Sequence, residues 1–129
     1  MNLNQVTVPS HDLEIAIPFY EKLGLNLIVK ALPHYARFEC PDGESTFSLH
    51  QVDQINPNND IWVYFEVDQL DQKVAELINL GIQFDEMPED KSWLWREARL
   101  KDPDGNQLIL YYAGENRKNP PWRLMGDGE

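Results

Sequence analysis

The 129-residue chain is poor in cysteine, in histidine and in basic residues. It has a single cysteine, Cys40, and three histidines. One thiol cannot form a disulfide within the chain, and it cannot supply the several cysteine ligands of a structural zinc site. Eleven basic residues stand against 22 acidic ones, and the formal net charge is −11 at pH 7. Such a surface repels phosphate backbones and anionic lipids, so neither nucleic acid nor a membrane is an expected partner.

Long hydrophobic runs are also absent. No stretch approaches the roughly 20 apolar residues that cross a bilayer, and the opening MNLNQVTVPSHDLE lacks the basic start and apolar run of a signal peptide. We therefore expect a soluble, cytoplasmic protein. The 42% hydrophobic and 11% aromatic fractions are sufficient for a folded core. The length fits one compact domain.

The chain contains an internal repeat. QVTVPSHDLEIAIPFYEKLGLNL begins at Gln5 and WVYFEVDQLDQKVAELINLGIQF begins at Trp62, an offset of 62 − 5 = 57 residues. Each copy predicts a strand, a helix with apolar residues at helical spacing, and a Leu-Gly stop. Each copy also ends in Pro-Asp-Gly before an extended run, CPDGESTFSLHQ and DPDGNQLILYY. In such a turn Pro fixes its own φ, Asp caps the turn, and Gly tolerates positive φ.

The remaining strands complete the order strand, helix, strand, strand, strand in each half. They are predicted at residues 26–30, 35–40, 82–86 and 93–100. Asp68 is the expected N-cap of the second helix, and the first helix is expected to kink at Pro18 or to begin near it. Because half the chain would bury too little surface alone, we predict an α+β fold. Two tandem βαβββ modules would form a cupped mixed sheet around a central cleft.

The predicted domain covers residues 1–113, with modules at about 1–52 and 61–113. The segment between them, DQINPNND at 53–60, is polar and contains Pro, which is typical of a linker. Residues 114–129 are expected to form a C-terminal tail. Trp122 is its one expected anchor, on the body or on a second subunit.

With these features the chain resembles the vicinal oxygen chelate superfamily, which includes glyoxalases, extradiol dioxygenases and bleomycin-resistance proteins. The matching stretches are QVTVPSHDLEIAIPFYEKLGL, FEVDQLDQKVAELINLGI and DPDGNQLILYY, and the resemblance covers about residues 1–113. It implies the paired-module fold and commonly a homodimer. It does not imply one function, because lyases, isomerases, dioxygenases and drug-sequestering proteins share this scaffold.

The resemblance also implies where a metal ion would be bound. In metal-dependent members four strand positions supply the ligands, usually His, His or Gln, and Glu. Motif by motif, these positions fall on Gln5, Ser48, Trp62 and Ile109. Only Gln5 offers a plausible donor, because serine is a weak ligand and neither an indole nor an isoleucine supplies one. We therefore predict no metal at the usual centre and no cofactor.

An indole and an isoleucine at these positions favour a pocket that stacks on a flat or apolar ligand. The residues predicted to bind the ligand are Gln5, Ser48, Trp62, Trp95, Ile109 and Tyr111. The leading hypothesis is metal-independent binding of a small aromatic or apolar ligand in the central cleft. The open alternative is a cavity filled by side chains, in a scaffold that only dimerises through its tryptophans.

A second hypothesis makes the protein a lyase or isomerase with a shifted divalent-metal or His-based site. His50 shares a strand face with Ser48, and an imidazole can act as a metal ligand or as a general base. Glu97, on one face of strand 93–100 with Trp95 and Arg99, is the second candidate catalytic residue, and Gln5 would complete the shifted site. His50 can equally be an exposed residue at a strand end, and Glu97 a member of a salt bridge of little weight. The sequence does not decide which face of strand 93–100 lines the cleft, or whether any reaction is catalysed.

Overall fold

The structure is a computed structural model, which describes residues 1–124. The chain folds into two compact units. The first comprises Met1–Trp62 and the turn Lys101–Gln107, and the second comprises Val63–Leu100 and the described chain that follows from Leu108 to Leu124. The last five residues of the predicted tail, 125–129, lie outside the described part. No helix in residues 1–124 combines the length and the apolar character that crossing a bilayer requires.

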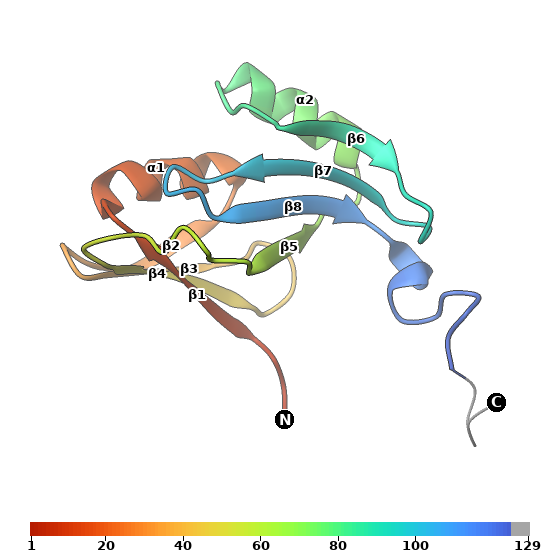
Figure 1. The fold of residues 1–129 in the computed structure, drawn as a ribbon, viewed down its shortest axis with the longest axis horizontal. Coiled ribbons are helices and arrows are strands. Elements are labelled where there is room, and N and C mark those ends of the chain that lie inside the picture. The colour runs from red at the N-terminus through yellow and green to blue at the C-terminus, as the bar shows by residue number, and fades with distance from the viewer. Residues whose placement is uncertain (125–129) are drawn as a thin grey trace. The chain divides into compact units, whose positions relative to one another are not determined.

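The two modules repeat one order of elements (Figure 1). The first consists of β1 (Gln5–Ser10), α1 (Leu13–Leu23), β2 (Asn26–Ala31), β3 (Tyr35–Glu39) and β4 (Thr46–Gln51). The second consists of β5 (Trp62–Glu66), α2 (Leu70–Asn79), β6 (Glu86–Asp90), β7 (Arg96–Lys101) and β8 (Gln107–Tyr112), followed by the 3-10 helix η1 (Gly114–Arg117). The strand orders are β1-β4-β3-β2 and β5-β8-β7-β6, with β1 parallel to β4. The prediction of an α+β fold with two tandem βαβββ modules is confirmed.

The helix boundaries correct two local predictions. Asp12 caps α1 by accepting the Glu14 N–H at 3.0 Å, so this helix begins at Leu13 and not near Pro18. The N-cap of α2 is Gln69, which makes no capping hydrogen bond with its side chain. Asp68 is therefore not the cap. It lies one residue too early for its carboxylate to occupy the capping position.

Two strands of the second module begin later than predicted. After α2, the Ile82 N–H donates to the Leu77 carbonyl at 3.0 Å, and Ile82 is buried. This bond extends the helix end, so β6 occupies 86–90 and not 82–86. A turn closed by the Leu94 N–H and the Lys91 carbonyl precedes β7, and Leu94 has a φ of 68°. A strand cannot pass through that dihedral angle, so β7 begins at Arg96 and not at residue 93.

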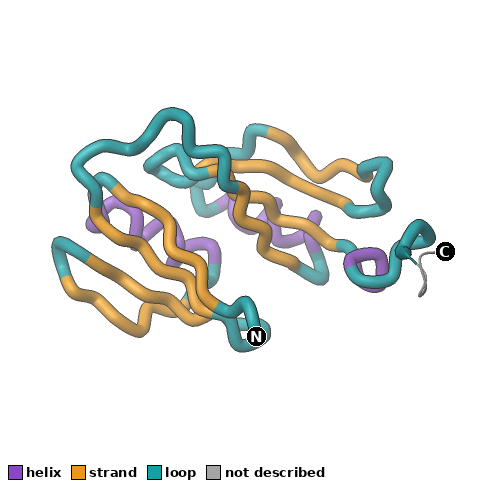
Figure 2. Tube along the Cα trace, turned by 60° about the horizontal axis from the view of Figure 1, so that its bottom comes forward, coloured by secondary structure: helices purple, strands orange, loops and turns teal. Residues whose placement is uncertain are grey.

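Each helix covers one face of its own sheet (Figure 2). In the first module the Tyr20 ring of α1 lies 4.7 Å from Phe47 and 5.8 Å from Phe38, measured between ring centroids. In the second module the buried residues Val74 and Leu77 of α2 belong to the core. Its strands contribute the buried residues Val63, Ala98, Leu100, Leu108 and Leu110, and also Ile109 and Tyr111.

Because side chains alternate along a strand, the intervening residues lie on faces that the module's own helix does not cover. We call these faces open only because the helix of the same module does not cover them, and some of their residues are buried. The first open face is defined by Gln5, Thr7, Tyr35, Arg37 and Ser48. The second open face is defined by Tyr64, Glu97, Arg99, Ile109 and Tyr111. Both kinds of candidate site residue predicted above, polar and aromatic, fall on these faces.

The turn before β8 is fixed by Asp102. Its Oδ2 accepts from the Tyr20 hydroxyl at 2.6 Å and from Asn106 Nδ2 at 2.8 Å, while its Oδ1 accepts the Asp104 and Asn106 N–H groups at 2.9 Å. The expectation that the Asp of Pro-Asp-Gly caps this turn is wrong here, because Asp104 instead accepts the His11 N–H at 2.7 Å. Burial raises the pKa of Asp102, and the bonds from Tyr20 and Asn106 oppose that rise.

Candidate ligand-binding faces

Three aromatic side chains meet on the second open face. Trp95 stacks on Tyr111 with ring centroids 4.7 Å apart and planes at 25°. Tyr64 presents its edge to both, at 5.8 Å from Trp95 and 5.4 Å from Tyr111. Ile109 is fully buried in the same apolar cluster, and the Trp95 indole N–H donates to the Asn116 carbonyl at 3.1 Å. These contacts hold the three rings against one another. We call Tyr64, Trp95 and Tyr111 the aromatic trio.

A buried carboxylate lies on the same face. Glu97 has 0% of its surface exposed, and its Oε2 accepts the Trp93 indole N–H at 2.8 Å. Its Oε1 lies 3.6 Å from Arg99 Nη2, too far for a hydrogen bond, and has no hydrogen-bond partner among the described residues. A buried polar atom without such a bond is costly and needs an explanation.

The negative charge of Glu97 affects the ionisation of Tyr64 in the aromatic trio. Burial and the Glu97 charge raise the pKa of Tyr64, while the Arg99 charge opposes the rise.

The orientation of strand β7, left open by the sequence, is settled within the second unit. Ala98 and Leu100 are in the core, and Arg96 reaches Asp71 of α2 at 2.8 Å. Glu97 and Arg99 therefore lie on the side of Ile109 and Tyr111.

A polar network occupies the first open face. Gln5 Nε2 donates to the Ser48 hydroxyl, and its Oε1 accepts from Thr46, which orients the amide. The Ser48 and Tyr35 hydroxyl oxygens are 2.7 Å apart, and Arg37 Nε donates to the Tyr35 oxygen at 2.8 Å. Ser48 is fully buried, whereas Tyr35 and Arg37 are half-buried.

The predicted site residues fall into two groups. Gln5 and Ser48 are hydrogen-bonded in the first unit, and Trp95, Ile109, Tyr111 and Glu97 are together in the second. Trp62, assigned to the first unit at the start of β5, is 52% exposed.

His50 is exposed at the end of β4. Its partners across the two ladders are Pro9 of β1 and Tyr35 of β3, whereas Gln5 pairs with Thr46 at the other end. At about 3.3 Å per residue, His50 and Gln5 are about 13 Å apart along the sheet, so they do not converge. Glu97 belongs to the other unit.

Sequence reasoning missed Tyr64, Tyr35 and Arg37. Tyr64 follows Trp62 by two residues, so the alternation of a strand places it on the same face. Tyr35 and Arg37 alternate in YARFEC in the same manner. The signal was present, but it is weak unless the covered face of each sheet is known.

The residues at the four ligand positions do not fit a divalent metal. The oxygen and nitrogen of Gln5 and the hydroxyl of Ser48 are engaged with neighbouring side chains. Trp62 and Ile109 carry no donor for a metal. In residues 1–124 no group of three or more His, Cys, Asp or Glu side chains is arranged to hold a metal ion. We therefore assign no chemical step to a metal.

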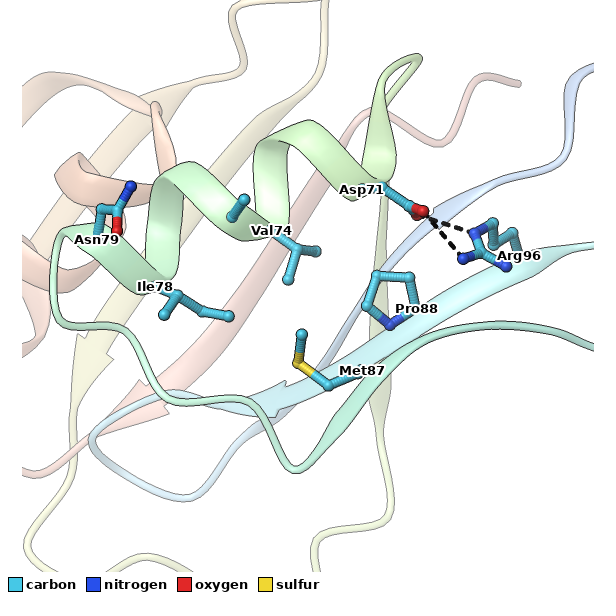
Figure 3. Close-up of a pocket in the computed structure, with 8 residues that line it drawn as sticks. Asp71, Val74, Ile78, Asn79, Met87, Pro88 and Arg96 are labelled. Carbon is cyan, nitrogen blue, oxygen red and sulfur yellow. Dashed lines mark hydrogen bonds and ion pairs between the residues drawn. The ribbon is translucent and has the colours of Figure 1, made fainter.

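A surface groove of about 480 Å³ lies between α2 and β6 (Figure 3). Its lining is mainly apolar and includes Val74, Ile78, Met87 and Pro88. Its charged residues, Asp71 and Arg96, pair with each other at 2.8 and 3.0 Å. Because those charges already satisfy one another, neither is a free anchor for a ligand, and the remaining polar side chain of the lining is Asn79.

Comparisons with known proteins agree with this architecture. The sequence profile of the Glyoxalase/Bleomycin resistance protein/Dioxygenase superfamily matches residues 2–110. A Bacillus subtilis (strain 168) protein named "Probable trivalent organoarsenical cleaving enzyme" is 29% identical over 115 residues, which are 81% of this chain and 75% of that protein.

Two crystal structures have the same fold. One is a glyoxalase/bleomycin resistance protein/dioxygenase from Nocardioides, with a TM-score of 0.77 and 23% identity over 97% of this chain and 90% of that one. The other is a bleomycin resistance determinant encoded on the transposon Tn5, with a TM-score of 0.74 and 22% identity over 87% and 98%. At these identities the likeness shows the fold alone.

Proposed function

The chain belongs to the glyoxalase/bleomycin resistance protein/dioxygenase superfamily, and from this premise we propose that it binds a small aromatic ligand without a metal, on its second open face. The observation that carries the proposal is the aromatic trio beside the buried Glu97 carboxylate, whose Oε1 has no hydrogen bond from any residue of the described range 1–124. The trio offers ring surfaces, and the carboxylate offers an acceptor.

Preorganisation supports stacking as the main source of affinity. The three ring centroids lie 4.7 to 5.8 Å apart, and Ile109 packs with Tyr111 and Trp95 in one apolar cluster. A ligand ring therefore does not have to order flexible side chains, which lowers the entropic cost of binding. Each well-placed aromatic pair contributes about 0.5–1.5 kcal/mol beyond its buried area.

Glu97 supports a ligand that carries a hydrogen-bond donor, such as an ammonium group. Trp93 now covers this carboxylate, and it lies in the turn before β7 and not in a strand. Rotation of its indole away from the face would open both oxygens of Glu97 to a donor on the ligand. Hydrogen bonds to charged groups contribute about 1.5–3 kcal/mol.

The preference for a donor is tested with tryptamine and indole, which share a ring but differ in the ammonium group. We expect isothermal titration calorimetry to show tryptamine binding about 10-fold or more tightly than indole. Glu97→Gln should remove most of this difference. Glu89→Gln is the matched control, since that carboxylate is exposed on β6, and it should keep the difference. Equal discrimination by the Glu97→Gln variant would contradict the assigned role.

Metal independence is tested separately. Elemental mass spectrometry on protein purified without chelator should find no stoichiometric divalent metal, before or after incubation with zinc, nickel and manganese salts. We expect this result because Gln5, Ser48, Trp62 and Ile109 together offer too few ligand atoms for a divalent metal. One tightly held metal per chain would instead favour the lyase or isomerase hypothesis.

Assembly and location complete the proposal. We propose a homodimer that works in the cytoplasm. Two tryptophans support an interface, since Trp62 and Trp122 are 52% and 56% exposed, and tryptophan is enriched at interfaces. The single cysteine is compatible with a reducing compartment. Sedimentation equilibrium should give twice the mass of the chain, and a monomer at all concentrations would contradict the dimer.

A further inference from the structure

The polar network on the first open face has no role in the proposed aromatic site, and its residues belong to the other unit. We propose that Arg37 and Tyr35 form a second binding site, which takes a small oxyanion such as a carboxylate or a phosphate. Ser48 and Gln5 are positioning residues that hold the Tyr35 hydroxyl. Binding of an oxyanion here does not depend on an aromatic ligand.

Counting the protons of the network supports a donor that faces outward. Gln5 donates into the chain of hydroxyls at Ser48, and Arg37 donates into it at Tyr35. The two hydroxyls have two protons between them, but the 2.7 Å contact that joins them uses one. One proton is therefore left over to donate elsewhere.

Burial assigns the surplus proton to Tyr35. Ser48 is fully buried, and no further acceptor near its hydroxyl is seen in the described chain, so it donates to Tyr35. The Tyr35 oxygen then accepts from both Ser48 and Arg37, and its own proton points out of the network from a half-buried residue. Burial raises the pKa of Tyr35, but the bonds with Ser48 and Arg37 outweigh that effect and lower it, which agrees with this direction of donation.

Arg37 supplies the positive charge beside that proton. Its guanidinium carbon lies 5.3 Å from the centre of the Tyr35 ring, and only Nε is used in the network. In residues 1–124 no carboxylate pairs with it, although the chain has 22 acidic residues. The nearest acidic residue along the same strand face, Glu39, accepts from Asn26 instead.

These groups match an oxyanion in number and kind. The free end of the guanidinium presents planar N–H donors, which suit the oxygens of carboxylate and phosphate. The Tyr35 proton adds a further donor, while the fixed amide of Gln5 keeps the Ser48 hydroxyl in place. Because the whole chain carries −11 charges, only a local arrangement of donors can attract an anion to this face.

The test is a titration of 15N-labelled protein with sodium acetate and with sodium phosphate, each against sodium chloride at the same ionic strength. We expect amide shifts at residues 35–37 and 48 that saturate with an oxyanion but not with chloride. Arg37→Gln should weaken that binding about 10-fold or more. Lys30→Gln, which removes one positive charge from the exposed part of the neighbouring strand β2, is the matched control and should have little effect.

The arms of the titration separate the possible ligands. Saturation by acetate alone would identify a carboxylate site, saturation by phosphate alone a phosphate site, and saturation by both a general oxyanion site. Arg37→Lys keeps the charge but loses the fork, so it should also bind more weakly than the parent, which protects the test if Arg37→Gln folds poorly. Shifts that chloride reproduces, or that persist unchanged in both Arg37 variants, would overturn the proposal.

Discussion

Replacing Trp95 with alanine should weaken the binding of tryptamine about 30-fold or more, the loss typical of a central aromatic anchor. The indole contacts both other rings of the aromatic trio, since it stacks on Tyr111 and meets the edge of Tyr64. Its removal takes away a stacking surface and frees the two tyrosine rings to move. Isothermal titration calorimetry of the parent and the variant measures the loss directly.

Trp122→Ala is the control for this substitution. It makes the same chemical change at an exposed tryptophan outside the trio, and it should leave the affinity for tryptamine unchanged. Circular dichroism must show that the Trp95→Ala variant is folded at the temperature of the titration, because truncating a partly buried tryptophan costs about 3 kcal/mol. A folded variant that binds with the affinity of the parent would exclude the trio as the binding surface.

The largest expected effect on stability belongs to Asp102. Asp102→Ala should lower the free energy of unfolding by about 3–5 kcal/mol. The carboxylate accepts four hydrogen bonds, and its loss leaves the buried Tyr20 hydroxyl and the turn's N–H groups without an acceptor. Urea unfolding followed by circular dichroism measures the change.

Asp42→Ala is the matched control for stability. Asp42 lies in the corresponding turn of the first module, is exposed, and should change the unfolding free energy by less than about 0.5 kcal/mol. A loss of stability from Asp42→Ala as large as that from Asp102→Ala would contradict the role given to the Asp102 hydrogen bonds.

The pH dependence of the stability difference between the parent and Asp102→Ala gives a further check. Burial raises the pKa of folded Asp102 above its value in the unfolded chain, so the folded state binds the proton more readily. Protonation of Asp102 therefore stabilises the folded state. This stabilisation is fully present below the pKa that Asp102 has in the unfolded chain, and it is lost as pH rises through the pKa that Asp102 has in the folded chain. The stability difference between the parent and Asp102→Ala should therefore grow as the solution is acidified through this range. A difference that shrinks would mean that the hydrogen bonds outweigh burial.

The internal repeat explains why the fold was predictable from the sequence. Alternation and turn residues located β2 and β3 within one residue, because NLIVK and YARFEC are bounded by clear turns. The later strands were misplaced for local reasons. Ile82 completes the helix end, and Leu94 adopts a positive φ that a branched side chain rarely takes.

The candidate sites were partly predictable. Trp95, Ile109 and Tyr111 are three of the six residues predicted to bind the ligand, and they lie in one apolar cluster. The other three, Gln5, Ser48 and Trp62, belong to the other unit. The direction of Glu97 could not be decided, since it depends on which face of β7 contacts α2. The role of Asp102 could not be predicted either. Its hydrogen bond from Tyr20 joins residues that are far apart in the sequence, and rules for local turns do not predict such long-range contacts.

The central claim is that the second open face binds an aromatic ring, and a chemical-shift map with tryptamine tests it most directly. In 15N-labelled protein we predict saturable shifts of the Trp95 indole N–H and of the amides of Tyr64, Glu97 and Tyr111. Shifts confined to the groove between α2 and β6, at Val74, Ile78 and Met87, would contradict the claim. So would spectra that do not change up to the highest concentration of tryptamine.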